Sequence, residues 1–101
     1  MAELKKLSIV RTVATLNKMV QIFKEEMSLT MTYSIEFDDP DDPVIVITID
    51  VPEFHGRYSA GIKLTTIANL CIHKDLNAVA EDLTTIFLSD MTNLIFKEIL
   101  K

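Results

Sequence analysis

The chain has 101 residues, a length that fits one domain and leaves no room for a second of ordinary size. Hydrophobic residues make up 49% of it, but no uninterrupted apolar run approaches the ~20 residues that a membrane-spanning helix requires. The formal net charge is −5 at pH 7, and a chain with this balance is not expected to bind the phosphate backbone of a nucleic acid. These values predict a single domain over residues 1–101, with no membrane or nucleic-acid partner and an apolar surplus that favours a subunit interface.

The start of the chain and its cysteine content both favour the cytoplasm. Residues 1–6 lack the basic start, apolar stretch and small-residue cleavage site of a secretory signal. Cys71 is the only cysteine, so neither an internal disulfide nor a multi-cysteine zinc site can form. We therefore expect a cytoplasmic protein in which Cys71 serves as a small buried hydrophobic residue.

A first helix is predicted between Glu3 and Met27, a stretch without Gly or Pro. Apolar residues recur there at alternating spacings of four and three, which puts them on one stripe: Ile9, Val13, Leu16, Val20, Phe23 and Met27. Leu7, Val10 and Ala14 form a shorter second strip, so we expect the helix to contact two neighbours. A helix lying on a sheet is the favoured interpretation, because a coiled-coil seam with this spacing would last under three heptads.

The next part of the chain predicts an antiparallel β-meander. Residues 29–37 alternate apolar and polar side chains, as in a half-buried strand, and residues 44–51 are apolar on both faces, as in a central strand. Four aspartates and two prolines separate these strands in residues 38–43, and a third strand follows over residues 58–64. Side-chain parity indicates Phe37 opposite Ile45 and Tyr58 opposite Val51, and it would let Lys63 reach Glu36 across the sheet.

The path after the third strand is less determined by pattern. Residues 65–73 continue the alternation without a turn, which favours an extended course and a fourth strand over a short helix at residues 66–72. Asp75 then reads as the N-cap of a helix over residues 76–100. Its apolar stripe changes direction midway, which predicts either a kink near Ser89 or a long straight helix whose last turns face a partner. The expected fold is α+β: an N-terminal helix, a three-stranded or four-stranded meander, and a long or kinked C-terminal helix packed on one sheet face.

No pattern in the chain predicts catalysis, a cofactor or a bound metal. The aspartate-rich turn lacks the central Gly and final bidentate Glu of an EF-hand loop, so a solvated hairpin turn is the favoured interpretation. Cys71 and His73 would point to the same side of a strand, but two ligands do not make a zinc site and the only other histidine is His55. A Cys–His pair would also need an orienting third group. We therefore expect no enzymatic activity.

Two groups of residues are candidates for protein recognition. The loop before the third strand combines Phe54, His55 and Arg57, which suits a recognition tip, although Phe54 could instead close the end of the core. The second strips on the two helices are candidates for an interface in a homo-oligomer, with a dimer as first choice: Leu7, Val10, Leu88, Met91, Ile95 and Ile99.

The favoured function is that of a non-enzymatic protein-interaction module, an oligomeric regulator, inhibitor or accessory factor of a microbe or phage that docks to another protein. In outline, a small acidic chain with helix, antiparallel meander and helix resembles the type III secretion chaperones, whose dimers present apolar surface to an unfolded effector segment. The chain carries no diagnostic motif of that family and has no room for its full set of strands and helices. A further alternative is nucleic-acid mimicry, since residues 28–56 carry seven acidic side chains and neither Lys nor Arg.

Overall fold

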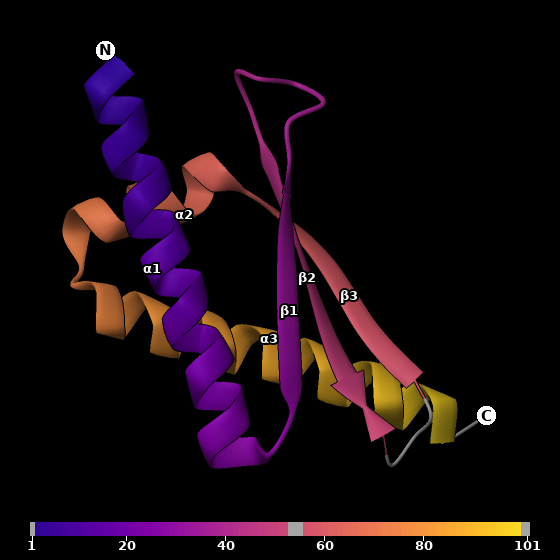
Figure 1. Ribbon diagram of the computed structural model, residues 1–101. Coiled ribbons are helices and arrows are strands. Elements are labelled where there is room, and N and C mark those ends of the chain that lie inside the picture. Colours follow the sequence, from indigo (N-terminus) through magenta and orange to yellow (C-terminus); the bar gives the residue numbers. More distant parts are fainter. Residues whose placement is uncertain (1, 53–55, 100–101) are drawn as a thin grey trace.

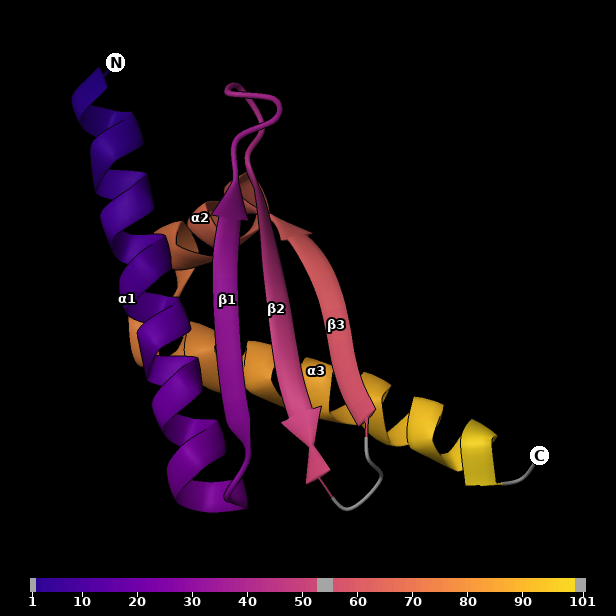
Figure 2. The same cartoon turned by 45° about the vertical axis from the view of Figure 1, so that its right-hand side comes forward.

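The computed structural model describes residues 2–52 and 56–99, and the side chains of most of them. In this part of the chain the order of elements is α1 (Ala2–Met27), β1 (Thr30–Glu36), β2 (Val44–Val51), β3 (Gly56–Lys63), α2 (Leu64–His73) and α3 (Leu76–Ile99). The strands form one antiparallel sheet in the order β1-β2-β3. The helix α1 runs alongside β1, and α3 crosses behind the sheet (Figures 1 and 2). The predicted α+β fold is confirmed, and no helix within the described ranges combines the length and apolar character needed to cross a bilayer.

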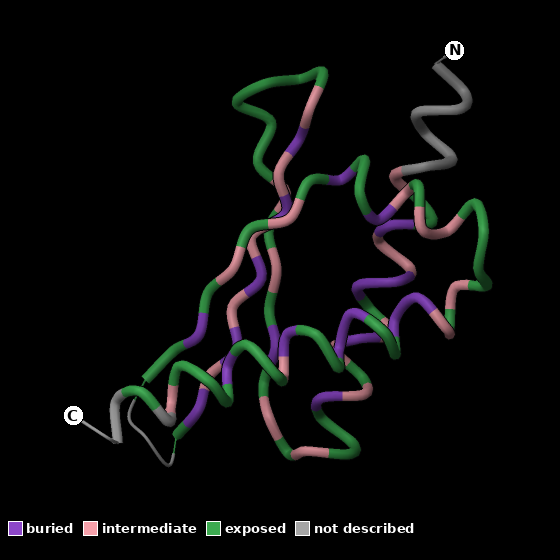
Figure 3. Tube along the Cα trace, turned by 180° about the vertical axis from the view of Figure 1, so that it is seen from behind, coloured by how far each residue is buried: buried purple, intermediate pink, exposed green. Residues whose placement is uncertain are grey.

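Strict alternation along β2 places the core on the side of the sheet that faces the helices. Ile45, Ile47 and Ile49 are completely buried, while the residues between them are only half-buried (Figure 3). The helices contribute further large members of this core, among them Leu16, Met19, Phe23, Ile67, Val79, Leu83 and Phe87. The opposite face of the sheet carries mainly Thr, Ser and charged side chains, as expected of a face in water.

The register preserves the predicted faces but differs from the predicted pairs by two residues in both hairpins. Ile35, not Phe37, lies opposite Ile45, and Tyr58 lies opposite Ile49 instead of Val51. A shift of two residues leaves every side chain on its face, so parity alone cannot exclude it. As a consequence, Phe37 falls beyond the end of β1 with 54% of its surface exposed.

The turn between β1 and β2 accounts for the shift in the first hairpin. The backbone N–H of Asp42 donates to the carbonyl of Asp39, and the N–H of Asp41 donates to the Asp39 carboxylate, each at 3.0 Å. The turn therefore closes on itself and takes Phe37 out of the ladder. It also brings Asp42 to Lys63, at 2.9 Å, so Lys63 pairs with this carboxylate and the predicted contact with Glu36 is replaced.

Helix α1 packs against α2, α3 and β1 together, so its buried face is wider than the predicted stripe. Leu16 and Phe23 are buried as expected, but Thr12, Thr15 and Met19 are buried as well. Several stripe members are only half-buried: Ile9, Val13, Val20 and Met27. The helix ends at Met27 and is followed by Ser28, whose φ of 56° is left-handed; the N–H of Leu29 donates to the Phe23 carbonyl at 3.0 Å.

The expectation of an extended segment over residues 65–73 is wrong, because these residues form α2. Leu64 and Ile67 are its buried residues, and their spacing of three matches one helical face. The N–H of Leu64 donates to the carbonyl of Pro43 at 2.9 Å, which anchors the start of this helix beside the β1–β2 turn. In the part of the chain that the structure describes, the sheet therefore has three strands.

The predicted N-cap of the last helix is confirmed. The carboxylate of Asp75 accepts from the backbone N–H groups of Asn77 at 2.8 Å and Ala78 at 3.3 Å. From there α3 runs as one continuous helix to Ile99. Its first half packs in the core, and its second half passes the Gly56 end of β3 (Figure 2). The two halves of the apolar stripe therefore contact different neighbours.

Candidate functional site

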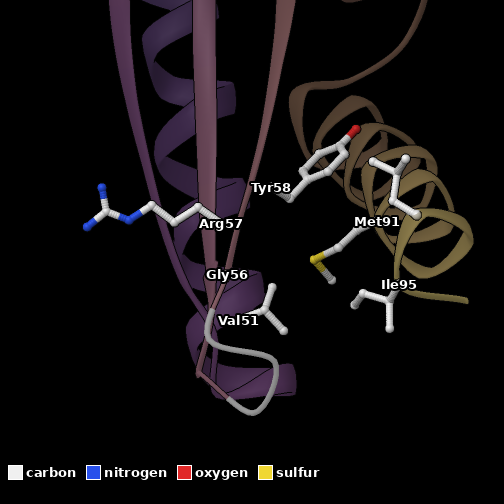
Figure 4. Close-up of a pocket in the computed structure, with 7 residues that line it drawn as sticks. Val51, Gly56, Arg57, Tyr58, Met91 and Ile95 are labelled. Atoms are coloured by element: carbon white, nitrogen blue, oxygen red, sulfur yellow. The ribbon is translucent and has the colours of Figure 1, made fainter. Parts of the chain in front are cut away.

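The strongest candidate site is an apolar hollow of about 400 Å³ between the end of the sheet and the second half of α3. We call it the β3–α3 hollow; its lining residues are Val51, Gly56, Arg57, Tyr58, Met91, Leu94 and Ile95 (Figure 4). Two strands and one helix meet there, so the site depends on the packing of residues that are far apart in sequence. Its size and apolar lining suit one or two apolar side chains of a binding partner.

Tyr58 is a buried residue that forms one wall of this hollow. Its ring packs edge-to-face on Phe87, with ring centroids 6.4 Å apart and an interplanar angle of 62°. Burial raises the pKa of the Tyr58 hydroxyl above its ordinary value, and the negative charge and hydrogen bonding of Asp90 raise it further. The side chain therefore stays neutral at physiological pH and contributes an apolar wall with one polar tip.

Arg57 borders the hollow but directs its charge elsewhere. Its side chain leaves the strand on the side opposite Tyr58 and points away from α3 (Figure 4). On that open face of the sheet, Arg57 Nε lies 3.0 Å from Asp50 Oδ1. The interior of the hollow thus contains no cation from Arg57, and we expect shape and apolar contact to decide what binds there.

The hollow adjoins the outer edge of the sheet. Within the described residues β3 pairs only with β2, so the backbone groups on its other side have no strand to bond. Helix α3 passes behind this edge strand and continues beyond it (Figures 1 and 2). A free strand edge beside an apolar hollow is an arrangement that accepts another strand.

A second hollow lies between α2 and the first half of α3. It measures about 410 Å³, and we call it the α2–α3 groove. Apolar side chains line it, and an ion pair between Lys74 and Asp82, at 2.7 Å, stands at its polar side. Ile86 belongs to this groove and is 54% exposed, while Leu94, in the first hollow, is 51% exposed.

The structure brings together members of both residue groups that the sequence singled out. Met91 and Ile95 from the helix line the same hollow as Arg57 from the loop. Met91 is buried within the chain itself, and Leu88 is half-buried against the core. Val10 is 62% exposed on α1 and is not among the residues lining this hollow.

Four predicted site residues cannot be placed in this way. Phe54 and His55 lie outside the described residues, and so do the side chains of Leu7 and Ile99. Leu94 was not predicted from the sequence as a site residue, because it lies outside the apolar stripe that runs through Met91 and Ile95. No sequence signal distinguishes Leu94 from an ordinary exposed leucine.

Cys71 and His73, the two residues considered for metal binding or nucleophilic chemistry, do not point to the same side. On α2, residues two apart point roughly 200° away from each other, so the predicted alignment of Cys71 with His73 is replaced by opposite directions. Cys71 is half-buried with its Sγ 3.5 Å from Thr15 Oγ1, and His73 is exposed. Across residues 2–52 and 56–99, no group of three His, Cys, Asp or Glu side chains could hold a metal ion.

Part of the acidic block is compensated within the chain. Asp42 pairs with Lys63 and Asp50 pairs with Arg57. The hydrogen bond with Asp42 is the largest cause that raises the pKa of Lys63. These pairs reduce the negative field on the open sheet face, which lessens its likeness to a row of phosphates.

Comparison with models of protein families, with curated protein sequences and with solved structures gave no match to this chain.

Proposed function

We propose that this chain is a non-enzymatic protein-interaction module, a homo-oligomeric regulator, inhibitor or accessory factor that docks to another protein in the cytoplasm. One observation carries the proposal: α3 holds a large, half-exposed apolar side chain beside each of two apolar hollows. Single exposed hydrophobic residues are common on protein surfaces, but an exposed one beside an apolar concavity is typical of an interaction site.

The α2–α3 groove is the surface that we assign to the partner protein. Leu70, Val79 and Leu83 form its apolar lining, and Ile86 stands exposed beside them. The Lys74–Asp82 ion pair supplies a polar margin. An apolar centre with a polar rim is the usual layout of a protein–protein interface, and an apolar side chain on a partner helix or loop would fit it.

Affinity capture from the cells that make this chain, followed by mass spectrometry, tests the proposal. The tagged wild-type chain is compared with Ile86→Glu and with Leu94→Glu, two substitutions of large apolar residues on one helix with nearly equal exposure. A charge at the centre of an interface weakens binding by roughly tenfold or more. We expect Ile86→Glu to lose a specific partner that the wild type and Leu94→Glu retain.

Circular dichroism first establishes that both variants keep their helix content. Capture of the same proteins in equal amounts by the wild type and by Ile86→Glu would remove the α2–α3 groove as the docking surface. The absence of any specifically captured protein would refute the function itself.

A further inference from the structure

We propose that the β3–α3 hollow and the free edge of β3 form an interface with a second copy of this chain. The two β3 strands pair antiparallel about a two-fold axis and join two sheets into one of six strands. This inference deepens the proposed function, since it rests on the chain being an interaction module and names how its copies associate.

The edge of β3 lacks the features that usually prevent strand pairing. The strand β3 pairs with β2 over all eight of its residues, from Gly56 to Lys63, and contains neither a bulge nor a proline that would disturb its other edge. Charged side chains often blunt an exposed edge, but Arg57 and Lys63 are drawn by their ion pairs toward Asp50 and Asp42. The backbone along this edge is therefore open to another strand.

The position of α3 makes the surface complementary to itself. The helix passes β3 near Gly56 and Tyr58, where the hollow lies, and continues beyond the strand (Figures 1 and 2). In an antiparallel pair, the Gly56 end of one strand lies beside the Lys63 end of the other. The projecting part of each α3 then lies over the other copy near Ile62, which is only half-buried within one chain.

Parity restricts the pairing register. Tyr58, Ala60 and Ile62 share the core side of β3, so a register that keeps both cores on one side must be centred on a residue. When the pairing is centred on Ala60, Tyr58 of each copy lies opposite Ile62 of the other copy. It sets Arg57 opposite Lys63, and both of these cations already have carboxylate partners.

The area needed for a stable dimer favours a second copy over a peptide as the occupant. Specific interfaces bury about 1,200–2,000 Å² in total, which one short strand pair does not supply alone. A second copy adds contacts of α3, on which Leu94 stands half-exposed beside the hollow, to the strand contact, and the two-fold symmetry makes every contact occur twice. A peptide strand would cover the edge but leave Leu94, which is 51% exposed, in water.

Sedimentation equilibrium and light scattering on the full chain, over low to high micromolar concentrations, test the inference. We expect a dimer for the wild type and for the matched control Ile86→Glu. Leu94→Glu is expected to be monomeric at the same concentrations with unchanged circular dichroism. A monomeric wild type, a dimeric Leu94→Glu, or dissociation by Ile86→Glu would each overturn the inference.

A cysteine introduced at the centre of the pairing tests the strand contact directly. In a Cys71→Ser background, Ala60→Cys should form a disulfide between copies under mild oxidation, because opposed Cβ atoms in a strand pair lie about 5 Å apart. Thr32→Cys on β1, in the same background, should not. A dimer that crosslinks equally at both positions, or at neither, would overturn the pairing of β3 with β3.

These results separate the two proposals. A Leu94-dependent dimer that captures no partner refutes the proposed function and leaves the interface standing. A monomer that captures a partner through Ile86 refutes the dimer, and with it the homo-oligomeric part of the proposed function, but leaves the docking to another protein standing.

Discussion

Replacing Phe37 by alanine tests the strand register, because sequence and structure place this side chain differently. Alternation predicts Phe37 in the core opposite Ile45, whereas the structure sets it beyond β1 with 54% of its surface exposed. Phe23 serves as the buried reference, because its side chain is completely buried between α1 and the rest of the core. The two Phe→Ala substitutions remove the same atoms from opposite environments.

The expected costs follow from these environments. Full burial of a Phe side chain contributes about 1.5–3 kcal/mol, so Phe37→Ala, at a side chain that is 54% exposed, should cost about 1 kcal/mol and leave no cavity. Truncation of Phe23 removes a complete transfer term and opens a cavity, which together cost about 3–5 kcal/mol. The difference between the variants should therefore be about 3 kcal/mol.

Urea unfolding followed by far-ultraviolet circular dichroism, at one fixed chain concentration, measures both values. With a slope of about 1–3 kcal/mol per molar urea, the two midpoints should differ by roughly 1–3 M. Equal slopes for the two variants are the control that both unfold the same structure. A loss at Phe37 as large as the loss at Phe23 would refute the observed register and restore Phe37 to the core.

Two further predictions concern polar groups in the core. The hydroxyl of Thr12 is buried without a hydrogen-bond partner, so Thr12→Val should stabilise the protein by about 1 kcal/mol in urea unfolding. The hydroxyl of Thr15 donates to the Arg11 carbonyl at 2.8 Å, so Thr15→Val should show no such gain. Equal effects of the two substitutions would contradict this reasoning. The raised pKa of Tyr58 makes the stability depend on pH at high pH, because the unfolded chain releases this proton first. The stability that the neutral hydroxyl contributes is complete below about pH 10 and is lost as the pH rises through the pKa of the folded state. The wild type should therefore lose more unfolding free energy than Tyr58→Phe between pH 9 and about pH 11, and parallel losses would show that Tyr58 is not the group responsible.

Local patterns in the sequence were sufficient for most elements. A period of 3.6 residues predicted α1 and α3, a period of two predicted β1, and a run that is apolar on both faces predicted β2. Asp75 marked the start of α3 through its side-chain oxygen. These features depend on neighbours within a few residues, which the sequence displays directly. The faces of the strands followed for the same reason, since parity is a local property.

The helix over residues 64–73 shows where local pattern became ambiguous. Its apolar residues fit an alternating strand almost as well as a short helix. The deciding contacts are distant in sequence: Leu64 bonds the carbonyl of Pro43, and Ile67 is buried in a core shared with α1 and α3. A short segment takes the conformation that its surroundings can bury, and those surroundings exist only in the folded chain.

The candidate site was foreseen in part. Met91, Ile95 and Arg57 were each singled out from the sequence, but as two unrelated groups. Their common hollow exists because α3 crosses the end of β3, and the crossing point depends on packing among all three helices and the sheet. The half-exposure of Leu94, and the position of exposed Val10 on α1 outside the lining of this hollow, follow from the same arrangement.

By itself, the sequence determined the α+β class, the hairpin faces, the helix cap and the acidic character of the turn between β1 and β2, because each of these is set by residue type and short-range periodicity. The tertiary structure decided the register within a given parity, the conformation of residues 64–73, the ion pairs Lys63–Asp42 and Arg57–Asp50, and the place where helix and sheet edge meet. These outcomes require groups from separate elements to come within a few ångströms of each other. Only packing of the whole chain determines which groups do so.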